Sequence, residues 1–494
     1  MKKILLIVFF LFAGSFSNRV FGQDSTRIRV DSLTLAIQHQ TDDKKRAGLY
    51  FLRGIDEETL MLPDSAMDDY TKAIGLNPQL KQAYVARGTL YEDKKKLAEA
   101  IKDDEIAITL YKDNKAELAY LYGRIGLVQW ELKHYPEALT ADSIADQLNP
   151  GDGFARVNIG FVHFATKNYE RAIQDFTIGM QDYKNNLKKL SIIVGARADA
   201  ERNFKKYKDA INDYLYALDI YPKNRASRWN LALSYKLTGD YLKAEAEYNK
   251  TISLFAGDNG YLAKLCDEKA MLKIEERNYK AALQDDSVAI SFDKNFGRAY
   301  NTMASAYMQN GDFKPAIDTY LLALTHNRDD KAESSTIYDA IADAYYFLGM
   351  FDKSVEASNS AISLRDSSAV TFFYRGRSYL KLKDNNRAVA DFNKVLSMDT
   401  SKRSYEYVFA LFYTGKPDEA IKSIQKSITD TTSNYLMQGH YYNMACLYAL
   451  LNKTDEANRY LKKCVDGGYS KKYALADPDL DNIKNTLEFK DIVK

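Results

Sequence analysis

Small side chains recur along this chain at fixed spacings, and this pattern constrains the fold more than any other feature. A central small residue, alanine in eleven of twelve copies, returns every 32 to 38 residues. The central positions are Ala66, Ala100, Ala138, Ala172, Ala210, Ala244, Ala282, Ala316, Ser354, Ala388, Ala420 and Ala457. A second small residue lies twelve positions earlier in eleven copies, Val408 being the exception. Such spacings predict places where two helices cross too closely for a large side chain.

Aromatic residues accompany the small residues at helical spacings. One often lies four residues before the first small position, as Tyr84 does, and another four residues after the central one, as Tyr248 does. A short polar break such as Gly239-Asp240 separates the two halves of each unit. Spacings of three and four place the apolar residues on one face of a helix. Each unit is therefore expected to be two antiparallel helices that need a neighbouring unit to bury their apolar faces.

This pattern resembles the tetratricopeptide repeat (TPR), in which aromatic, Leu-Gly, Tyr, Ala, aromatic, Ala and Pro recur. The closing proline of the family is present at Pro78, Pro150 and Pro222. The resemblance covers residues 47–471 in about twelve copies, and the copy at 401–434 departs most from the pattern, with Val408 and Leu411 at key positions. It implies an all-α fold, an α-solenoid in which about twelve helix-turn-helix units form a right-handed superhelix with short helical caps.

The two ends of the chain differ from the repeats. Lys2-Lys3 and an apolar run from Ile4 to Ala13 predict a secretory signal peptide at residues 1–22, removed before Gln23. The run is too short to remain as a transmembrane helix, and no cysteine follows it as a lipoprotein would require. We expect an N-terminal capping segment at 23–46, the TPR array at 47–471 and a C-terminal cap at 472–494. The mature protein is expected to be exported, periplasmic or secreted, soluble and not a lipoprotein.

Repeat length alternates between 34 and 38 residues over most of the array. The extra length follows the second helix of each even-numbered repeat, at 112–115, 184–187, 257–260 and 328–331. This alternation indicates a 72-residue double repeat. Because the inserted residues are rich in Asn, Asp and Gly, the sequence predicts longer loops at one edge of the solenoid in every second repeat.

Charge and cysteine content exclude two classes of protein. Without residues 1–22 the chain carries 66 basic and 67 acidic residues, interleaved along the helices. Nucleic-acid binding needs a concentrated positive face, so a nucleic-acid partner is not expected. Three cysteines are too few for a disulfide framework. Cys266, Cys446 and Cys464 are expected to be buried thiols, with a Cys446–Cys464 bridge as the alternative.

The sequence contains none of the common catalytic motifs. It lacks G-x-S-x-G, a phosphate-binding Gly-rich loop, H-E-x-x-H and C-x-x-C. The five histidines lie in different parts of the chain, and His163 occupies a position where the family has a packing aromatic. Acid pairs such as Asp103-Asp104 are adjacent on one helix and are not opposed across a cleft. We therefore expect no enzymatic activity, no cofactor and no metal.

In the TPR family the first helices line an inner groove, through positions two, five, nine, twelve and thirteen of each unit. Carried onto this sequence, the resemblance implies a partner-binding groove formed by Tyr120, Trp130, Phe154, Phe161, Phe164, Trp229, Leu233, Met271, Tyr346, Phe347 and Phe373. Polar residues lie between them, namely Asp199, Arg202, Asn203, Lys236, Asp267, Arg298, Asn301, Asp339, Asp343 and Arg377. Position five never carries lysine in the first ten units, so the family's clamp for a C-terminal carboxylate is not expected.

These features predict an exported, non-enzymatic TPR scaffold that binds a protein or peptide through its aromatic-lined groove. Large rigid aromatic side chains favour such a role because they bury much area at little entropic cost. The alternative is a carbohydrate-binding envelope protein that uses Trp130, Trp229 and tyrosines as stacking platforms for a glycan. A third alternative is a regulatory or oligomer-forming module that assembles through its end repeats.

Overall fold

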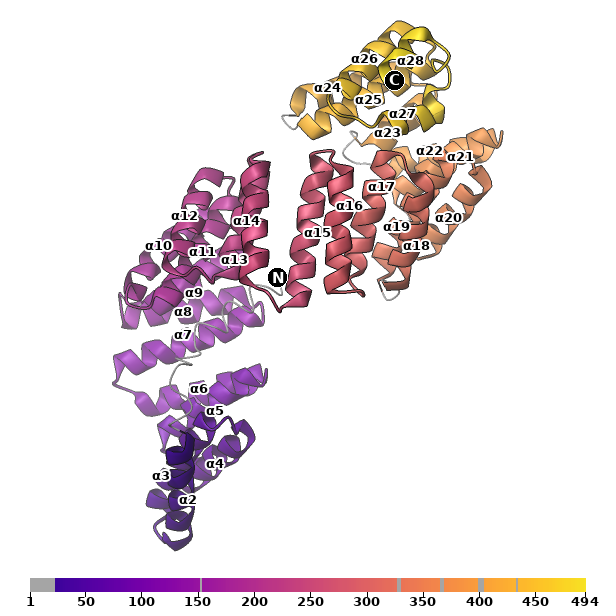
Figure 1. Ribbon diagram of the computed structural model, residues 1–494. Coiled ribbons are helices and arrows are strands. Elements are labelled where there is room, and N and C mark those ends of the chain that lie inside the picture. Colours follow the sequence, from indigo (N-terminus) through magenta and orange to yellow (C-terminus); the bar gives the residue numbers. More distant parts are fainter. Residues whose placement is uncertain (1–22, 152, 327–329, 365–367, 399–403, 432–433) are drawn as a thin grey trace. The chain divides into compact units, whose positions relative to one another are not determined.

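The computed structural model describes residues 23–494 except 152, 327–329, 365–367, 399–403 and 432–433. The predicted signal peptide lies outside the described residues. The chain divides into two compact units, and the boundary, between Glu247 and Tyr248, falls within helix α14 (Tyr241–Leu254). Each unit is an array of paired helices (Figure 1). The described residues thus form the all-α helical-repeat array that the spacing of small residues predicts.

The N-terminal unit begins with α2 (Gln23–His39), which packs on the first helix of the first hairpin. The first helices of its hairpins are α3 (Asp43–Thr59), α5 (Lys81–Asp93), α7 (Lys115–Glu131), α9 (Gly153–Ala165), α11 (Leu187–Asn203) and α13 (Arg225–Leu237). The second helices are α4 (Pro63–Leu76), α6 (Leu97–Tyr111), α8 (Tyr135–Leu148), α10 (Tyr169–Gly179), α12 (Tyr207–Ile220) and α14. A 3-10 turn, η1 (Met180–Tyr183), extends α10.

The C-terminal unit continues the same alternation. Its first helices are α15 (Asn259–Glu275), α17 (Gly297–Asn310), α19 (Lys331–Phe347), α21 (Ala369–Lys381), α23 (Tyr405–Tyr413) and α25 (Asn434–Leu450). Its second helices are α16 (Tyr279–Phe292), α18 (Phe313–His326), α20 (Phe351–Leu364), α22 (Asn385–Met398), α24 (Pro417–Asp430) and α26 (Thr454–Asp466). A C-terminal segment of α27 (Lys471–Ala476), η2 (Pro478–Leu480) and α28 (Leu487–Val493) follows.

The recurring small residues lie where the two helices of each hairpin cross. All twelve central residues, from Ala66 to Ala457, are fully buried. At the glycines that occupy the earlier small position, a larger residue would crowd a side chain of the second helix, an aromatic ring in three copies and an aspartate in two. A Cβ on Gly160, for example, would lie 2.8 Å from the Phe176 ring. The pattern of small residues is therefore a direct consequence of close helix packing.

The longer loops expected after every second repeat were a wrong prediction. Connections between hairpins are nearly equal, and the four extra residues add one turn to the next first helix, so that α7, α11, α15 and α19 have 17 residues while α5, α9 and α13 have 13. One Asn or Asp in each segment interpreted as loop is an N-cap: Asn114, Asn186, Asp258 and Asp330. Asn114, for example, accepts a hydrogen bond from the backbone N–H of Glu117. Four residues are close to one helical turn of 3.6, so the insertion keeps the apolar face in register.

Four hairpins are also held by an arginine–aspartate pair sixteen residues apart. The guanidinium of each arginine, on the first helix, donates two hydrogen bonds to a carboxylate on the second helix at 2.6–2.9 Å. The pairs are Arg53–Asp69, Arg87–Asp103, Arg197–Asp213 and Arg375–Asp391. The sixteen-residue spacing is visible in the sequence, but only the pairing of the two helices shows that it brings the arginine and the aspartate into contact.

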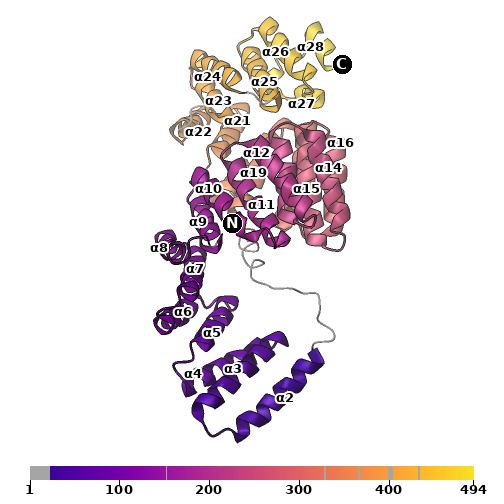
Figure 2. The same cartoon turned by 90° about the vertical axis from the view of Figure 1, so that its left-hand side faces the viewer.

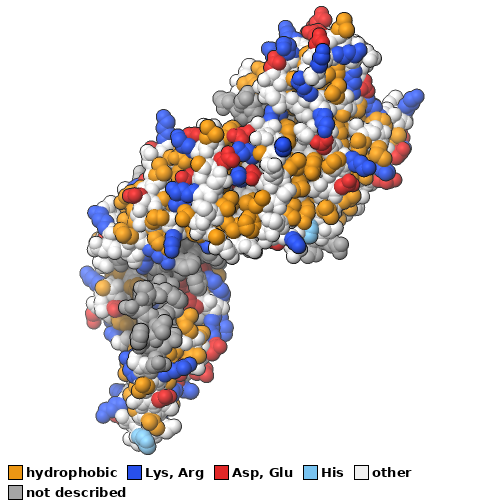
Figure 3. Space-filling view, in the orientation of Figure 1, with side chains coloured by type: hydrophobic (Ala, Val, Ile, Leu, Met, Phe, Trp, Pro, Cys, Tyr) orange, Lys and Arg blue, Asp and Glu red, His pale blue; other side chains and the backbone are white. Residues whose placement is uncertain are grey.

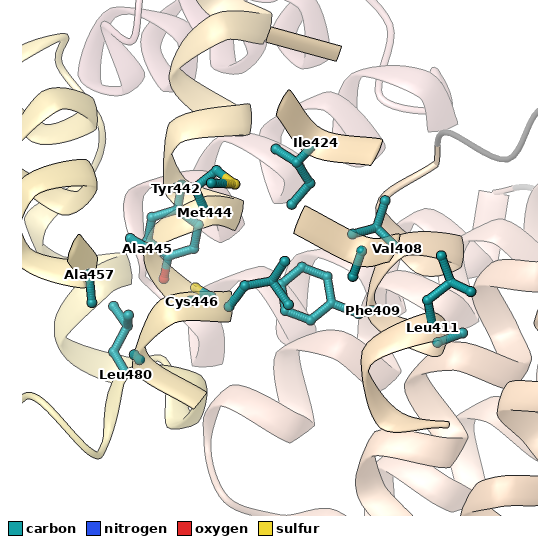
Figure 4. Packing of buried hydrophobic residues seen from close by; sticks show 14 of the residues in the cluster. Val408, Phe409, Leu411, Ile424, Tyr442, Met444, Ala445, Cys446, Ala457 and Leu480 are labelled. Carbon is teal, nitrogen blue, oxygen red and sulfur yellow. The ribbon is translucent and has the colours of Figure 1, made fainter. Parts of the chain in front are cut away.

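The most divergent repeat copy still forms a hairpin, α23 and α24. Val408 and Leu411, which replace the expected small residue and tyrosine, are buried in the C-terminal hydrophobic core beside Phe409 (Figure 4). The same core receives Leu480 from η2 and Phe489 from α28. In both views of the ribbon α27 and α28 lie next to α25 and α26 (Figures 1 and 2). The C-terminal segment therefore covers the last hairpin, as a cap does.

Candidate partner-binding surfaces

The first helices of successive hairpins lie on one side of each unit, and several neighbouring pairs of them touch. Examples are α7 and α9 in the N-terminal unit and α15 and α17 in the C-terminal unit. The second helices lie behind the first helices and contact the first helix of the next hairpin. We call the side of the first helices that faces away from the second helices the inner face. It is the surface on which the sequence predicts a partner-binding groove.

The structure separates the eleven predicted groove residues into two groups. The solvent-accessible group consists of Tyr120, Phe154, Phe164, Trp229, Leu233 and Met271. Within it, Tyr120 and Phe154 come from neighbouring first helices, and their ring centroids lie 6.2 Å apart. The buried group consists of Trp130, Phe161, Tyr346, Phe347 and Phe373. Buried side chains offer no surface to a partner, so these five belong to the core in this structure.

Trp130 and Phe161 are buried because they pack against each other between α7 and α9. Their ring centroids lie 5.9 Å apart, and Phe161 in turn makes an edge contact with Phe176 of α10 at 5.0 Å. These aromatics fill the space between successive hairpins. Trp130 and Phe161 occupy positions that face inward in the family pattern, but in this structure they pack between repeats.

Tyr346 and Phe347 are buried for a different reason, since the end of the chain covers this part of the inner face of the C-terminal unit. Phe373 is buried by packing between hairpins, against Phe392, Tyr405 and Phe409. The Tyr473 ring packs on Phe347 at 4.5 Å and on Phe313 at 5.7 Å. The Ser470 hydroxyl donates to the carbonyl of Asn310 at 2.9 Å, 160 residues earlier in the sequence. The predicted C-terminal cap thus also occupies part of the predicted groove.

A buried polar cluster fixes this segment to the inner face. Arg377 of α21 donates to Asp479 at 2.8 Å, and its guanidinium lies 4.0 Å from the centre of the Tyr346 ring. The Tyr442 hydroxyl donates to Asp477 at 2.6 Å. Burial, with the adjacent Asp479 carboxylate, raises the pKa of Asp477 to about 6. Burial likewise raises the pKa of Asp343, which faces Arg377, to about 7.

An open pocket lies on the inner face of the N-terminal unit, at residues that the groove prediction did not include. It has a volume of about 250 Å³. Its lining consists of Phe51, Ile55 and Glu58 of α3, Tyr70 of α4, Gln82, Val85, Ala86 and Thr89 of α5, and Tyr111 of α6. Several of these residues occupy family groove positions in the first two repeats. The groove prediction rests mainly on large aromatic residues, whereas six of the nine residues that line this pocket are aliphatic or polar.

Carboxylates gather beside this pocket. Glu58 lies in its wall, and Glu92 and Asp93 lie at the end of α5. Burial raises the pKa of Glu58, and the nearby Asp93 raises it further. Burial also raises the pKa of Glu92 and of Asp93. Over the face of the molecule in Figure 3, by comparison, acidic and basic side chains are interleaved.

The remaining reactive side chains have ordinary structural surroundings. Cys266, Cys446 and Cys464 are free and buried, so the alternative of a Cys446–Cys464 bridge is not realised. The His163 ring contacts Asp175 of α10 at 2.7 Å. Across the described residues, no group of three His, Cys, Asp or Glu side chains is placed to hold a metal ion. None of the described helices is long and apolar enough to cross a membrane.

Models of the tetratricopeptide repeat match this chain at residues 196–259 and at 297–330, 335–368, 372–402 and 441–466. Among curated proteins, the chain is 28% identical over 164 residues to a tetratricopeptide repeat protein 4 homolog of Dictyostelium discoideum, over 32% of this chain and 39% of that protein. It is 24% identical over 400 residues to a TPR repeat-containing protein of Methanocaldococcus jannaschii, over 74% of this chain and 66% of that protein. The chain thus spans less than two thirds of either relative's length.

Solved structures of repeat proteins are also similar to the chain. A tetratricopeptide repeat protein of Parabacteroides merdae superposes with a TM-score of 0.41 at 18% identity, over 55% of this chain and 99% of that one. The C-terminal part of a TPR repeat-containing protein of Cytophaga hutchinsonii superposes with a TM-score of 0.42 at 14% identity, over 51% and 98%. The repeat models match segments in both units, and each matched segment falls on paired helices with buried small residues at their crossing. The chain is a tetratricopeptide repeat protein.

Proposed function

We propose that this protein is an exported, non-enzymatic scaffold that holds a protein or peptide partner on the inner face of its N-terminal unit. TPR arrays are a scaffold fold, and a partner protein is the ligand class that such a fold suggests. Export follows from the sequence of residues 1–22. Periplasmic or secreted localisation is part of the same proposal.

The observation that supports a polypeptide ligand best is the C-terminal segment itself. An inner face built from these repeats holds residues 470–480 through aromatic contacts, such as Tyr473 on Phe347, and through ion pairs, such as Asp479 with Arg377. Both are contacts that a partner segment can make equally well. The inner face of the N-terminal unit lacks this internal occupant among the described residues, and it carries Tyr120, Phe154 and the pocket between α3 and α5.

The carbohydrate alternative depends on exposed tryptophans. Trp130 is 9% exposed and packs on Phe161, so it offers no stacking platform. Trp229 alone does not make an aromatic platform of the kind that the alternative requires. We therefore propose a protein or peptide partner and treat glycan binding as an outcome of the test.

Site-specific photo-crosslinking tests the proposal. A benzoylphenylalanine is placed at Leu233, half-buried on the first helix α13, or at Leu215, exposed on the second helix α12, in the chain that starts at Gln23. Each protein is irradiated in envelope extract, and adducts are identified by mass spectrometry. We expect a discrete protein adduct from position 233 and none from position 215. Equal labelling from both positions, or recovery of glycan without protein, would contradict the proposal.

A reconstitution with the purified partner completes this test. Leu233→Asp places a charge on the inner face, and Leu215→Asp is its matched control on the second helix. Truncation or charge reversal at an interface anchor typically weakens binding by about 2 kcal/mol or more. The first variant should therefore lose affinity about thirtyfold, whereas the control should bind as the unmodified chain does.

A further inference from the structure

The pocket between α3 and α5 has an elongated apolar floor. Phe51 and Ile55 are one helical turn apart on α3, and Val85 and Ala86 face them from α5. The Phe51 ring rests on Tyr70 of the second helix with the centroids 5.8 Å apart, which fixes the rear of the floor. This lining suits the methylene stem of a long side chain as well as a purely apolar one.

One carboxylate stands at the end of this apolar floor without a cation. Glu58 accepts a hydrogen bond from the Tyr70 hydroxyl at 2.7 Å. Among the described residues, no lysine, arginine or histidine nitrogen lies within 4.0 Å of Glu58, and the acidic Asp93 is near enough to raise the pKa of its carboxyl. A half-buried carboxylate surrounded by apolar side chains is stabilised strongly by an incoming positive charge.

Other acidic residues lie near Glu58, at the end of α5 and beyond it. Two of them already have internal partners, since Arg124 lies 3.7 Å from Glu92 and Lys95 lies 2.9 Å from Glu131. Arg124 is buried and also donates to the carbonyl of Val85 at 3.1 Å, so it is already held by internal contacts. Asp93 is exposed and, like Glu58, forms no ion pair in the described part of the chain. The pocket therefore presents one acid in its wall, Glu58, that has no ion-pair partner in the described part of the chain, with Asp93 near it.

We propose that this pocket binds a lysine or arginine side chain of a partner protein, flanked there by apolar residues. The aliphatic stem lies on Phe51, Ile55 and Val85, and the charged end pairs with Glu58 within reach of Asp93. The inference rests on the proposed function, and it adds the chemistry of the partner: a basic, amphipathic segment. A pocket for a basic side chain differs from the family's clamp, which holds a C-terminal carboxylate.

A peptide-library selection tests this inference without knowledge of the natural partner. A phage-displayed library of random peptides is selected on the full chain from Gln23, and in parallel on the Glu58→Gln variant. Glutamine keeps an acceptor for the Tyr70 hydroxyl and removes only the charge. Glu105→Gln, the same change at an exposed position of α6, is the matched control.

We expect the selection to enrich lysine or arginine next to apolar residues on the unmodified chain and on the control, and to lose that enrichment on Glu58→Gln. The synthesised consensus peptide should bind the unmodified chain about ten-fold or more tightly than the Glu58→Gln variant, as is typical of one charge-assisted hydrogen bond. Its affinity should fall as the salt concentration rises.

Two other results would overturn the inference and can be told apart. Enrichment of an acidic or uncharged consensus, or of a basic one that Glu58→Gln leaves unchanged, refutes the chemistry assigned to this pocket while leaving a peptide-binding scaffold intact. No enrichment of any peptide on a folded chain refutes both the inference and the proposed function.

Discussion

Arg377 and Asp479 form a buried ion pair at 2.8 Å although 102 residues separate them in the sequence. Arg377 belongs to the first helix α21, and Asp479 to the short turn η2 near the C-terminus. The pair therefore joins the inner face of the C-terminal unit to the segment that covers it. The two inner faces therefore differ in structure, because one holds an internal segment and the other presents an open pocket.

Removing the arginine should destabilise the C-terminal unit. In Arg377→Met, the carboxylates of Asp479 and Asp477 lose their shared cation inside the protein. Breaking one side of a buried pair costs about 3–5 kcal/mol. Urea denaturation followed by circular dichroism should show a lower unfolding midpoint. Arg387→Met, which removes an exposed pair with Asp384, should lower the midpoint far less, because solvent screens an exposed ion pair. Equal effects of the two substitutions would mean that the buried pair does not hold the segment.

Gly311 should be far less replaceable than Gly349, although both have a positive φ, +84° and +71°. An alanine at either position pays the strain of a left-handed backbone, about 1 kcal/mol. At Gly311 the new Cβ would also lie 2.7 Å from the backbone nitrogen of Tyr473, whereas at Gly349 it meets open space. Gly311→Ala should therefore displace the C-terminal segment.

Limited trypsin digestion measures that displacement. Gly311→Ala should be cleaved after Lys471 or Lys472 faster than the unmodified chain, and Gly349→Ala should be cleaved at the unmodified rate. Cleavage of all three at one rate would show that the segment does not depend on its contact with Gly311.

Stability of the C-terminal unit should fall as the pH rises from about 5 to 8. The folded state raises the pKa of Asp343 to about 7 and that of Asp477 to about 6, mainly through burial. Because the folded state binds these protons more tightly than the unfolded chain, their stabilising contribution is complete below about pH 4 and is lost as the pH rises through 7.

Asp343→Asn removes one of these carboxyl groups and so measures its contribution to the change of stability with pH. The difference between the urea midpoints at pH 5.5 and pH 8 should shrink in the variant. Asp286, whose pKa burial raises to about 9, remains in the variant and keeps part of the slope. A slope unchanged by Asp343→Asn, or a midpoint that rises with pH in the unmodified chain, would contradict this assignment.

The two tryptophans should behave differently on substitution by alanine. Trp130 is buried between α7 and α9, so Trp130→Ala should cost about 3–5 kcal/mol of folding free energy by leaving a cavity. Trp229 is half-buried on α13, and its loss should be smaller. Thermal melts of both variants test this order. A larger loss for Trp229 would reverse the division into core and surface aromatics.

The local architecture was predictable from sequence because each hairpin crossing is a contact between residues close in the chain. Gly160 and Phe176, for example, are sixteen residues apart, and such spacings recur in every copy. The extra helical turn was missed because asparagine and aspartate mark both turns and helix N-caps, and Asn114 is the latter.

The candidate site was less predictable than the fold. Burial of Phe347 depends on Tyr473, a contact that spans more than a hundred residues and repeats nowhere else in the pattern. The pocket at Phe51 and Val85 lies on family groove positions, but its distinguishing feature is the unpaired charge of Glu58, which requires knowledge of all its neighbours in space.

Hydrogen–deuterium exchange of the full chain tests the central claim most directly. Exchange is measured by mass spectrometry with and without the consensus peptide from the library selection. Binding slows exchange in the elements that it stabilises. We predict that the added protection is largest in α3 and α5 and absent from α19, α21 and residues 470–480. Protection concentrated in the C-terminal unit, or on the second helices, would contradict an open binding face in the N-terminal unit.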